Sequence, residues 1–70
     1  MNLKQAQVGV AYTIKHIDTA DRELNAFLFS LGCYSGESIT VTRHLKNGCI
    51  VQIKDGRYHI DRPLAEAITV

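Results

Sequence analysis

The alternation of apolar residues between positions 39 and 60 is the feature that most restricts how this chain can fold. Apolar side chains recur at every second position in three short segments, which is typical of strands with one face against a core. The apolar positions are odd in the first two segments and even in the third. Glycine-containing turns separate the segments at 46–48 and 55–56. We therefore expect two consecutive antiparallel hairpins that share one apolar face.

The first hairpin is expected to turn over three residues. Its apolar face would combine side chains from both strands, namely Ile39, Val41, Arg43, Cys49, Val51 and Ile53. These positions share a face only if the numbers of paired residues sum to an even value. A two-residue turn at 47–48 gives odd sums, whereas a three-residue turn at 46–48 gives even ones. We therefore predict the longer turn, with Gly48 in a left-handed bulge.

The second hairpin needs odd sums, because the apolar residues of its second strand are even-numbered. A two-residue turn at 55–56 pairs Ile53 with Tyr58 and Val51 with Ile60. Its sequence, Asp-Gly, is the one that tight type I′ hairpins prefer. Both hairpins are then consistent with one continuous apolar face.

Near the N-terminus, the apolar residues again recur with period two. Val8, Val10, Tyr12 and Ile14 are expected to point to one face of a strand. Ile17 is odd-numbered, whereas the residues of that face are even-numbered, so in a regular strand its side chain would point to the opposite face. The strand therefore either ends before Ile17 or contains a bulge that changes the direction of its side chains.

A helix is predicted at about 20–31. Asp18 or Thr19 can cap its free N–H groups, and Gly32 suits the left-handed residue that ends a helix. The apolar face has helical spacing and comprises Leu24, Phe27, Leu28 and Leu31. Phe29 lies on the opposite side, so we expect this large aromatic side chain to be exposed.

The C-terminal segment completes the predicted fold. Pro63 suits the first turn of a short helix at 63–67, and alternation at 68–70 predicts a closing strand. The whole chain then has four or five short antiparallel strands with one helix inserted after the first. We predict a single domain, 1–70, of the mainly β class, folded as a small and strongly bent barrel.

Composition places this domain among small soluble proteins. Its apolar fraction is 46% and its charged fraction 21%, and no apolar run approaches the roughly 18 residues of a membrane span. The N-terminus lacks the apolar stretch of a signal peptide, which favours a cytoplasmic location without membrane insertion. Cys33 and Cys49 are too few for a disulfide-stapled secreted domain, so we expect reduced thiols.

Several sequence motifs together resemble one known family. The run at 31–41 fits the pattern Leu-Gly-x-x-x-Gly-x-x-Ile-x-Val, and 51–58 after Gly48 looks like the paired strands of that family. The ending at 68–70 reads Ile-x-Val, shortly after an alanine. Leu3 and the Val-Gly pair at 8–9 fit as well. The set, in this order and over nearly the whole chain, resembles the ferrous iron transport protein A (FeoA) domain, an SH3-like barrel.

The resemblance implies a small cytoplasmic accessory to a membrane ferrous iron transporter, ferrous iron transport protein B, which carries a cytoplasmic GTPase domain. It implies no catalytic residues. The same domain type also ends some iron-dependent repressors, so a regulatory module of that kind is an alternative. Many relatives have basic residues just before the Leu-Gly element, whereas this chain has none at 25–30. This departure favours an apolar contact through Phe29.

Metal binding and catalysis both find little support in the sequence. The candidate ligands are His16, His44, His59, Cys33 and Cys49, and none has a spacing such as Cys-x-x-Cys. The register predicted above places His59 opposite Gln52 on the outer surface and gives His44 the opposite parity to Val41. Cys33 follows a helix C-terminus, whose dipole disfavours a thiolate. We therefore expect no metal site, no cofactor and no enzymatic activity.

Nucleic-acid binding is the alternative from a different class, since small barrels often bind RNA or DNA. The favourable residues are Arg43, Lys46, Lys54 and Arg57, with Tyr34 or Tyr58 available for stacking. However, eight basic and seven acidic residues give a net charge of only +1. The two hairpin tips also lie at opposite ends of their shared strand, which separates Lys46 from the other cations. We therefore do not expect a nucleic-acid partner.

A protein-binding module is the function that this sequence favours. SH3-like barrels present loops and a shallow groove that can take a peptide or a helix. The candidate contact residues are Phe29, Tyr34, Ser35, Ile50 and Arg57. Ile50 points away from the predicted apolar face, so its alternative role is a contact in self-association.

Overall fold

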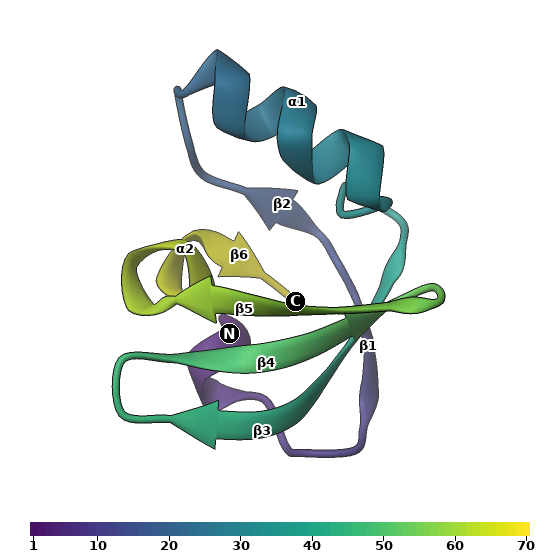
Figure 1. Cartoon of the computed structure of the whole chain (residues 1–70), viewed down its shortest axis with the longest axis vertical. Helices are drawn as coiled ribbons and strands as arrows, with labels where there is room; N and C mark the ends of the chain where they lie inside the picture. The colour runs from purple at the N-terminus through teal and green to yellow at the C-terminus, as the bar shows by residue number, and fades with distance from the viewer.

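The computed structural model describes all 70 residues and contains two antiparallel sheets and one main helix (Figure 1). In chain order the elements are η1 (Leu3–Gln5), β1 (Ala11–Thr13), β2 (His16–Ile17), α1 (Arg22–Leu31), β3 (Ser38–Leu45), β4 (Gly48–Ile53), β5 (Gly56–Asp61), α2 (Arg62–Ala67) and β6 (Ile68–Thr69). Four strands form a sheet in the order β1-β3-β4-β5, and β2 pairs with β6. The predicted mainly β class with one inserted helix is confirmed, although the strands form two sheets rather than one closed barrel.

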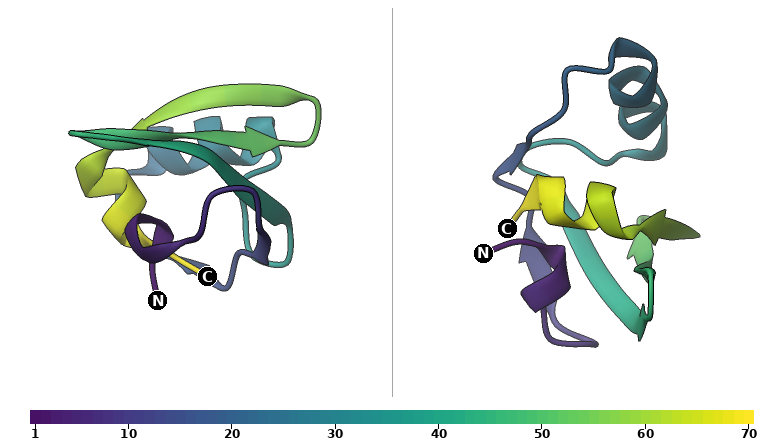
Figure 2. Two further views of the ribbon diagram at one scale, coloured as in Figure 1. Left: turned by 90° about the horizontal axis from the view of Figure 1, so that it is seen from below. Right: turned by 90° about the vertical axis from the view of Figure 1, so that its left-hand side faces the viewer.

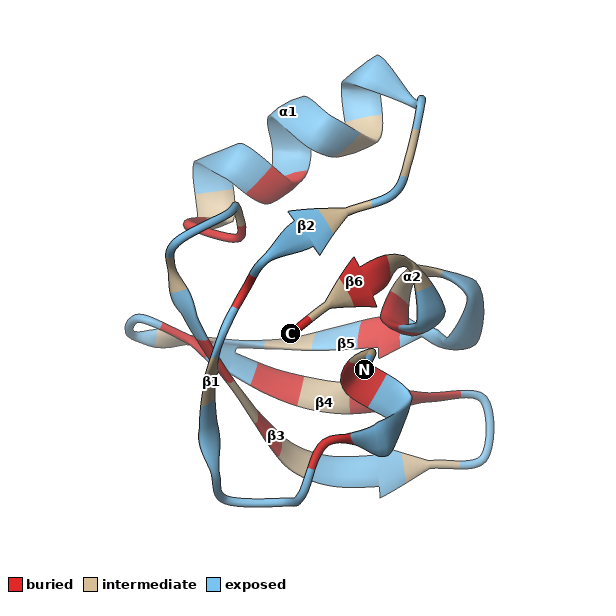
Figure 3. Cartoon of the chain, turned by 180° about the vertical axis from the view of Figure 1, so that it is seen from behind, coloured by how far each residue is buried: buried red, intermediate tan, exposed pale blue.

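The core lies on the inner face of the four-stranded sheet, covered by η1, α2 and β6 (Figure 3). Its largest fully buried side chains are Leu3, Ile14, Ile39, Val41, Val51, Ile53 and Ile68, together with both cysteines. The alternation of buried residues along β3 and β4 is the one that the apolar pattern predicts. Cys33 and Cys49 are free thiols, as expected.

The first hairpin keeps the predicted parity but not the predicted partners. Leu45 pairs with Gly48, so the turn has two residues rather than three. A bulge between Val41 and Arg43 then restores the even sum, and Val41 faces Val51, whereas the predicted turn would have paired it with Ile53. The bulge moves Arg43 to the outer face, which corrects its expected place beside Val41. It also pairs His44 with buried Cys49 across the two strands. The His44 Nε2 atom lies 2.8 Å from the Ala6 carbonyl oxygen.

Gly48 is required by packing between strands. Its φ is 154°, and a Cβ atom at this position would collide with the backbone carbonyl oxygen of Ile60. The glycine therefore allows the close approach of β5 to the start of β4. The left-handed bulge predicted for Gly48 is replaced by the bulge further along β3.

The second hairpin turns one residue earlier than predicted. Lys54 and Asp55 form the turn, Ile53 pairs with Gly56, and Val51 pairs with Tyr58. The predicted partners are thus wrong by two positions, but the odd sum is kept and Tyr58 still faces the core side. Lys54 adopts a left-handed φ of 52°, which is costly for a residue with a Cβ. Its ammonium lies 3.6 Å from the Glu37 carboxylate, a contact that helps to hold this turn.

The N-terminal strand is shorter than its apolar pattern suggests. Val8 and Val10 are exposed, which corrects the expectation that they share a face with half-buried Tyr12 and buried Ile14. The reason is a turn at 8–9, where Gly9 has a φ of 85° and its N–H donates to the Val41 carbonyl. After Ile14 the chain leaves this sheet, and Ile17 pairs with Ile68 of β6. This change of sheet explains the broken parity at Ile17.

Helix α1 begins at Arg22, two residues later than predicted. Its cap is Asp21 rather than Asp18 or Thr19, because the Asp21 carboxylate accepts from the Leu24 N–H at 3.0 Å. Gly32 ends the helix in the left-handed conformation, as predicted. In Figure 1 and the right-hand view of Figure 2, α1 lies at one end of the molecule, beyond β2.

The packing of α1 is narrow. Leu28 is its only buried residue, with Leu24 and Leu31 half-buried beside it. Phe27 is 57% exposed, so its predicted place in the core is wrong. A helix that contacts the rest of the molecule along one line leaves the flank at Phe27 in solvent. Phe29 is 65% exposed, as expected from its position on the far side of the helix.

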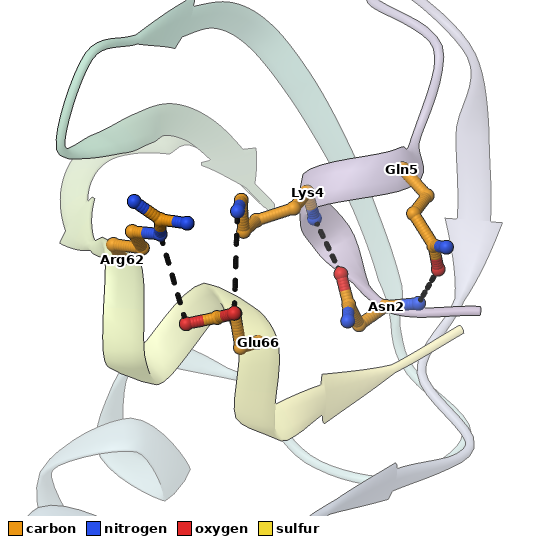
Figure 4. Close-up of polar contacts among 5 residues, drawn as sticks. All are labelled: Asn2, Lys4, Gln5, Arg62 and Glu66. Carbon is orange, nitrogen blue, oxygen red and sulfur yellow. Dashed lines mark hydrogen bonds and ion pairs between the residues drawn. The ribbon is translucent and has the colours of Figure 1, made fainter.

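The C-terminal segment forms the short helix and the closing strand that were predicted. Asp61 caps α2, with Pro63 in its first turn, and β6 then leads back to the N-terminus. Figure 4 shows Glu66 between Lys4 and Arg62, at 4.0 and 3.9 Å. These half-exposed ion pairs contribute at most about 1 kcal/mol each. None of the helices has the length and apolar character needed to cross a membrane.

Candidate binding groove

A groove of about 240 Å³ lies between β2, α1 and the loop that follows the helix. Its lining residues are His16, Ile17, Asn25, Phe29, Cys33, Tyr34 and Ser35. The strand β2 supplies two of these, α1 supplies two, and the loop supplies three in succession. Three of the five sequence-predicted contact residues, Phe29, Tyr34 and Ser35, therefore meet in one place.

The aromatic surface of the groove is a stacked pair. The rings of Phe29 and Tyr34 have centroids 4.6 Å apart and an angle of 27° between their planes. Gly32 makes this contact possible, because its left-handed conformation turns the chain back along the helix end. Stacking contributes about 0.5–1.5 kcal/mol beyond the area it buries. Phe29 is thus held in one position although most of its surface is exposed.

The loop beyond the helix is fixed from both sides. The Gly36 N–H donates to the Ile14 carbonyl, and the Ile14 N–H donates to the Glu37 carbonyl, both at 2.8 Å. The Ser35 hydroxyl donates to the Lys15 carbonyl at 3.0 Å. The loop and the segment that enters β2 therefore form one unit, and the groove has a defined shape without a partner.

Two titratable groups of the groove have raised pKa values. Hydrogen bonding to Glu37 and the negative charge of that carboxylate raise the pKa of Tyr34 above its ordinary value. Burial raises the pKa of the Cys33 thiol to about 11. Cys33 is therefore a protonated, buried part of the groove floor and lacks the thiolate character that a nucleophile needs.

Ile50 and Arg57 lie outside the groove. Ile50 is opposite His59, and Arg57 is opposite Gln52, so all four are on the outer face of the sheet formed by β4 and β5. The predicted pairing of His59 with Gln52 is wrong, because the β4–β5 turn comes one residue earlier than expected. The five predicted contact residues thus belong to two surfaces, and their roles remain predictions.

Four groove residues were not among the contacts predicted from the sequence, namely His16, Ile17, Asn25 and Cys33. Asn25 could have been found, because it precedes Phe29 by one helical turn and shares its side of the helix. The position of His16 depends on the passage of the chain from one sheet to the other. That passage is a tertiary feature with no local signal beyond the parity break at Ile17.

The histidines and cysteines lie in different parts of the fold. His16 lines the groove, His44 contacts the Ala6 carbonyl, and His59 is on the outer face of the sheet. No three His, Cys, Asp or Glu side chains gather closely enough to hold a metal ion.

Two short antiparallel sheets with one inserted helix define a small SH3-like β domain. The particular family follows from a match of the whole chain, residues 1–70, to the model of the FeoA domain. The chain belongs to the FeoA domain family, which is associated with ferrous iron transport.

Solved structures show the same fold at low sequence identity. The solution structure of FeoA from Chlorobium tepidum has a TM-score of 0.85 and 22% identity, over 99% of this chain and 67% of that one. FeoA from Stenotrophomonas maltophilia, solved with zinc and described as an SH3-domain protein and a candidate ferrous iron transport activating factor, has a TM-score of 0.81 and 17% identity, over 100% and 88%. A manganese-dependent transcriptional repressor has a TM-score of 0.78 and 23% identity, over 97% of this chain and 39% of that one. No curated protein sequence matches the chain.

Proposed function

We propose that this protein is an accessory of a ferrous iron transport system that acts in the cytoplasm. It binds the cytoplasmic side of the membrane transporter, ferrous iron transport protein B, at or beside the GTPase domain. The contact is protein to protein and uses the groove between β2 and α1. The observation that carries this proposal is Phe29, a large aromatic side chain held by stacking on Tyr34 and yet 65% exposed.

The energetics of Phe29 favour a role in binding. Complete burial of a phenylalanine side chain is worth about 1.5–3 kcal/mol, most of which Phe29 does not gain in the isolated domain. A partner that covers it gains this energy at little entropic cost, because the ring and the loop are already fixed. Exposed, rigid aromatic residues are the usual centres of binding energy in protein interfaces.

The family and one relative support the choice of partner. The FeoA domain family is associated with ferrous iron transport, and the Stenotrophomonas protein is described as a candidate activating factor of that process. Ile50 and Arg57 on the outer face of the sheet form a second proposed contact surface. Self-association through Ile50 is the alternative use of that surface.

The decisive experiment is a titration of the labelled full chain with the soluble GTPase domain of the transporter, followed by backbone amide NMR. We expect shifts at β2, at α1 and in the loop at 32–37. Phe29→Ser should weaken binding about tenfold, which corresponds to about 1.4 kcal/mol. Phe27→Ser is the matched control, because Phe27 is on the same helix and is 57% exposed but does not line the groove.

Three outcomes would contradict the proposal. Equal losses of affinity in Phe29→Ser and Phe27→Ser would mean that the helix as a whole matters and the groove does not. Shifts confined to residues around Ile50 and Arg57 would move the contact to the outer face of the sheet. Shifts that depend on the concentration of the labelled protein alone would indicate self-association.

A further inference from the structure

We propose that Lys54, at the tip of the β4–β5 hairpin, is a positioning residue of the groove and holds Tyr34 in its stack on Phe29. Lys54 does not itself line the groove. The hairpin tip and the loop after α1 lie near each other at one side of the molecule (Figure 1). For its effect on binding the inference rests on the proposed function, whereas its effect on the two rings belongs to the free protein.

The first argument is the backbone of Lys54. Lys54 and Asp55 are the central residues of a two-residue turn, and of these two only Lys54 has a positive φ, of 52°. A hairpin turn with a positive φ at its first central position usually has glycine there. A residue with a Cβ atom keeps such a conformation only where its surroundings hold it, and residues of this kind are frequent at functional sites. The contacts of the Lys54 side chain therefore compensate the cost of its backbone.

The second argument is the packing of the Lys54 stem on the glycine that ends α1. A Cβ atom placed on Gly32 would lie 2.5 Å from the Lys54 Cε atom and 3.0 Å from its Cδ atom. The lysine stem thus covers the point at which the chain turns back toward Tyr34. The last turn of α1 contains no basic residue. The Lys54 ammonium, one bond beyond Cε, brings a positive charge to this end of the helix, where the helix dipole favours it.

The third argument is the contact that the charged end of Lys54 makes with the other end of the loop. The ammonium lies 3.6 Å from the Oε1 atom of Glu37. The Glu37 carboxylate also accepts a hydrogen bond from the Tyr34 hydroxyl, which contributes to the raised pKa of Tyr34. The Tyr34 ring in turn stacks on Phe29. Lys54 is therefore connected to the stacked rings through a single carboxylate.

The backbone hydrogen bonds of the loop do not fix the Tyr34 side chain. They hold the main chain, for example through the two bonds between the loop and Ile14. A tyrosine at the surface can change its rotamer unless both its ring and its hydroxyl are held. The pair of Lys54 with Glu37 is partly exposed and is weak by itself, so the packing of the stem on Gly32 is needed as well. Together these contacts keep one rotamer of Tyr34, and a partner then meets rings that are already in place.

The first test uses the free full chain. In Lys54→Gly we expect weaker NOEs between the ring protons of Phe29 and Tyr34, and ring-proton shifts closer to those of exposed side chains. The urea midpoint should change little, because relief of the left-handed backbone offsets the lost contacts. Lys46→Gly is the matched control, since Lys46 is an exposed lysine without an ion pair in the turn at the other end of β4. It should leave the signals of both rings unchanged.

Further variants separate the stem of Lys54 from its charge. Lys54→Met keeps an apolar stem and removes the ammonium, so it should loosen the rings only in part. Lys54→Arg keeps both features and should restore the signals of the parent chain. If Lys54 acts through Glu37, the effect of Lys54→Met should be smaller in a chain that already carries Glu37→Gln.

The second test measures affinity for the soluble GTPase domain of the transporter. Lys54→Gly should weaken binding about threefold to tenfold, although the residue lies outside the groove. Lys54→Arg and Lys46→Gly should both bind as the parent chain does.

Three results would overturn the inference. They are unchanged ring signals in Lys54→Gly, an equal effect of Lys46→Gly, and a failure of Lys54→Arg to restore the rings. A fall of the urea midpoint with unchanged ring signals would give Lys54 a purely structural role and would also overturn it. The proposed function fails separately, if Phe29→Ser does not change binding to the GTPase domain. Ring signals that respond to Lys54→Gly in a chain that does not bind the GTPase domain would support the inference and contradict only the proposed function.

Discussion

Replacement of Leu28 by alanine should be the most damaging single truncation in helix α1. Leu28 is 2% exposed and is the only buried residue of the helix. Truncation of a buried leucine to alanine costs about 2–5 kcal/mol, depending on how far the site can collapse. Half-buried Leu24 and Leu31 flank Leu28 and can close part of the space, so we expect about 3 kcal/mol.

That loss is large for a domain of this size. Stabilities of about 0.05–0.15 kcal/mol per residue correspond to about 4–10 kcal/mol for 70 residues. A loss of 3 kcal/mol, at about 4–8 °C for each kcal/mol, lowers the melting temperature by about 12–24 °C. Urea denaturation followed by circular dichroism measures the change directly, with Phe27→Ala as the control because Phe27 is mostly exposed.

Leu28→Ala must cost clearly more stability than Phe27→Ala for this explanation to hold. A cost below about 1 kcal/mol for Leu28→Ala would show that α1 is held by contacts other than its one buried side chain. An equal cost for Phe27→Ala would show that Phe27 packs in solution. Binding to the transporter domain should fall with Leu28→Ala even where the protein remains folded, since the groove needs α1 in place.

Three further predictions concern stability and reactivity. Gly48→Ala should cost about 3 kcal/mol or more of stability, because the new Cβ atom would meet the carbonyl oxygen of Ile60. Gly9 has open space around it, so Gly9→Ala should cost only about 1–2 kcal/mol, for its left-handed φ. Comparable losses for the two variants in urea denaturation would contradict the packing argument. Burial raises the pKa of Cys33 from 9.0 to about 11, so the stability it contributes is complete below about pH 9 and is lost as the pH rises through about 11. Alkylation of Cys33 at about pH 8, followed by mass spectrometry, should be much slower in the folded protein than in urea, and equal rates would show an accessible thiol. Glu66→Gln should change the free energy of unfolding by less than about 0.5–1 kcal/mol, since its pairs with Lys4 and Arg62 are half-exposed; a larger loss would reveal a cooperative network.

The sequence could predict which residues of the central strands face the core but not how the chain turns between them. Alternation along 39–60 requires an even sum for β3 with β4 and an odd sum for β4 with β5, and both sums are found beside the core. Several turns satisfy the same parity. A two-residue turn with a bulge near Thr42 replaces the predicted three-residue turn, and a turn at 54–55 replaces the one at 55–56. Parity thus determines the face of each residue, whereas its partner across the strands depends on packing that has no local signal.

The candidate site was predictable in part for a similar reason. Phe29, Tyr34 and Ser35 are close in sequence, and Gly32 between them marks the reversal that brings the rings together. Ile50 was predicted as a contact because it points away from the apolar face, a property that does not say where on the surface it lies. The contribution of β2 to the groove could not be predicted, since it depends on the pairing of Ile17 with Ile68.

The narrow packing of α1 links these errors to the proposed function. The pattern of Leu24, Phe27, Leu28 and Leu31 describes a helix with a wide apolar face, but the fold buries only one of the four. Helical periodicity shows which side chains share a side of the helix, and the neighbouring elements decide how many of them are covered. Phe27 and Phe29 are both left in solvent, so exposure does not distinguish them. The surroundings do: Phe29 alone has a stacked ring and a loop fixed by hydrogen bonds beside it, which is why Phe29→Ser and Phe27→Ser should differ in binding while both leave the core intact.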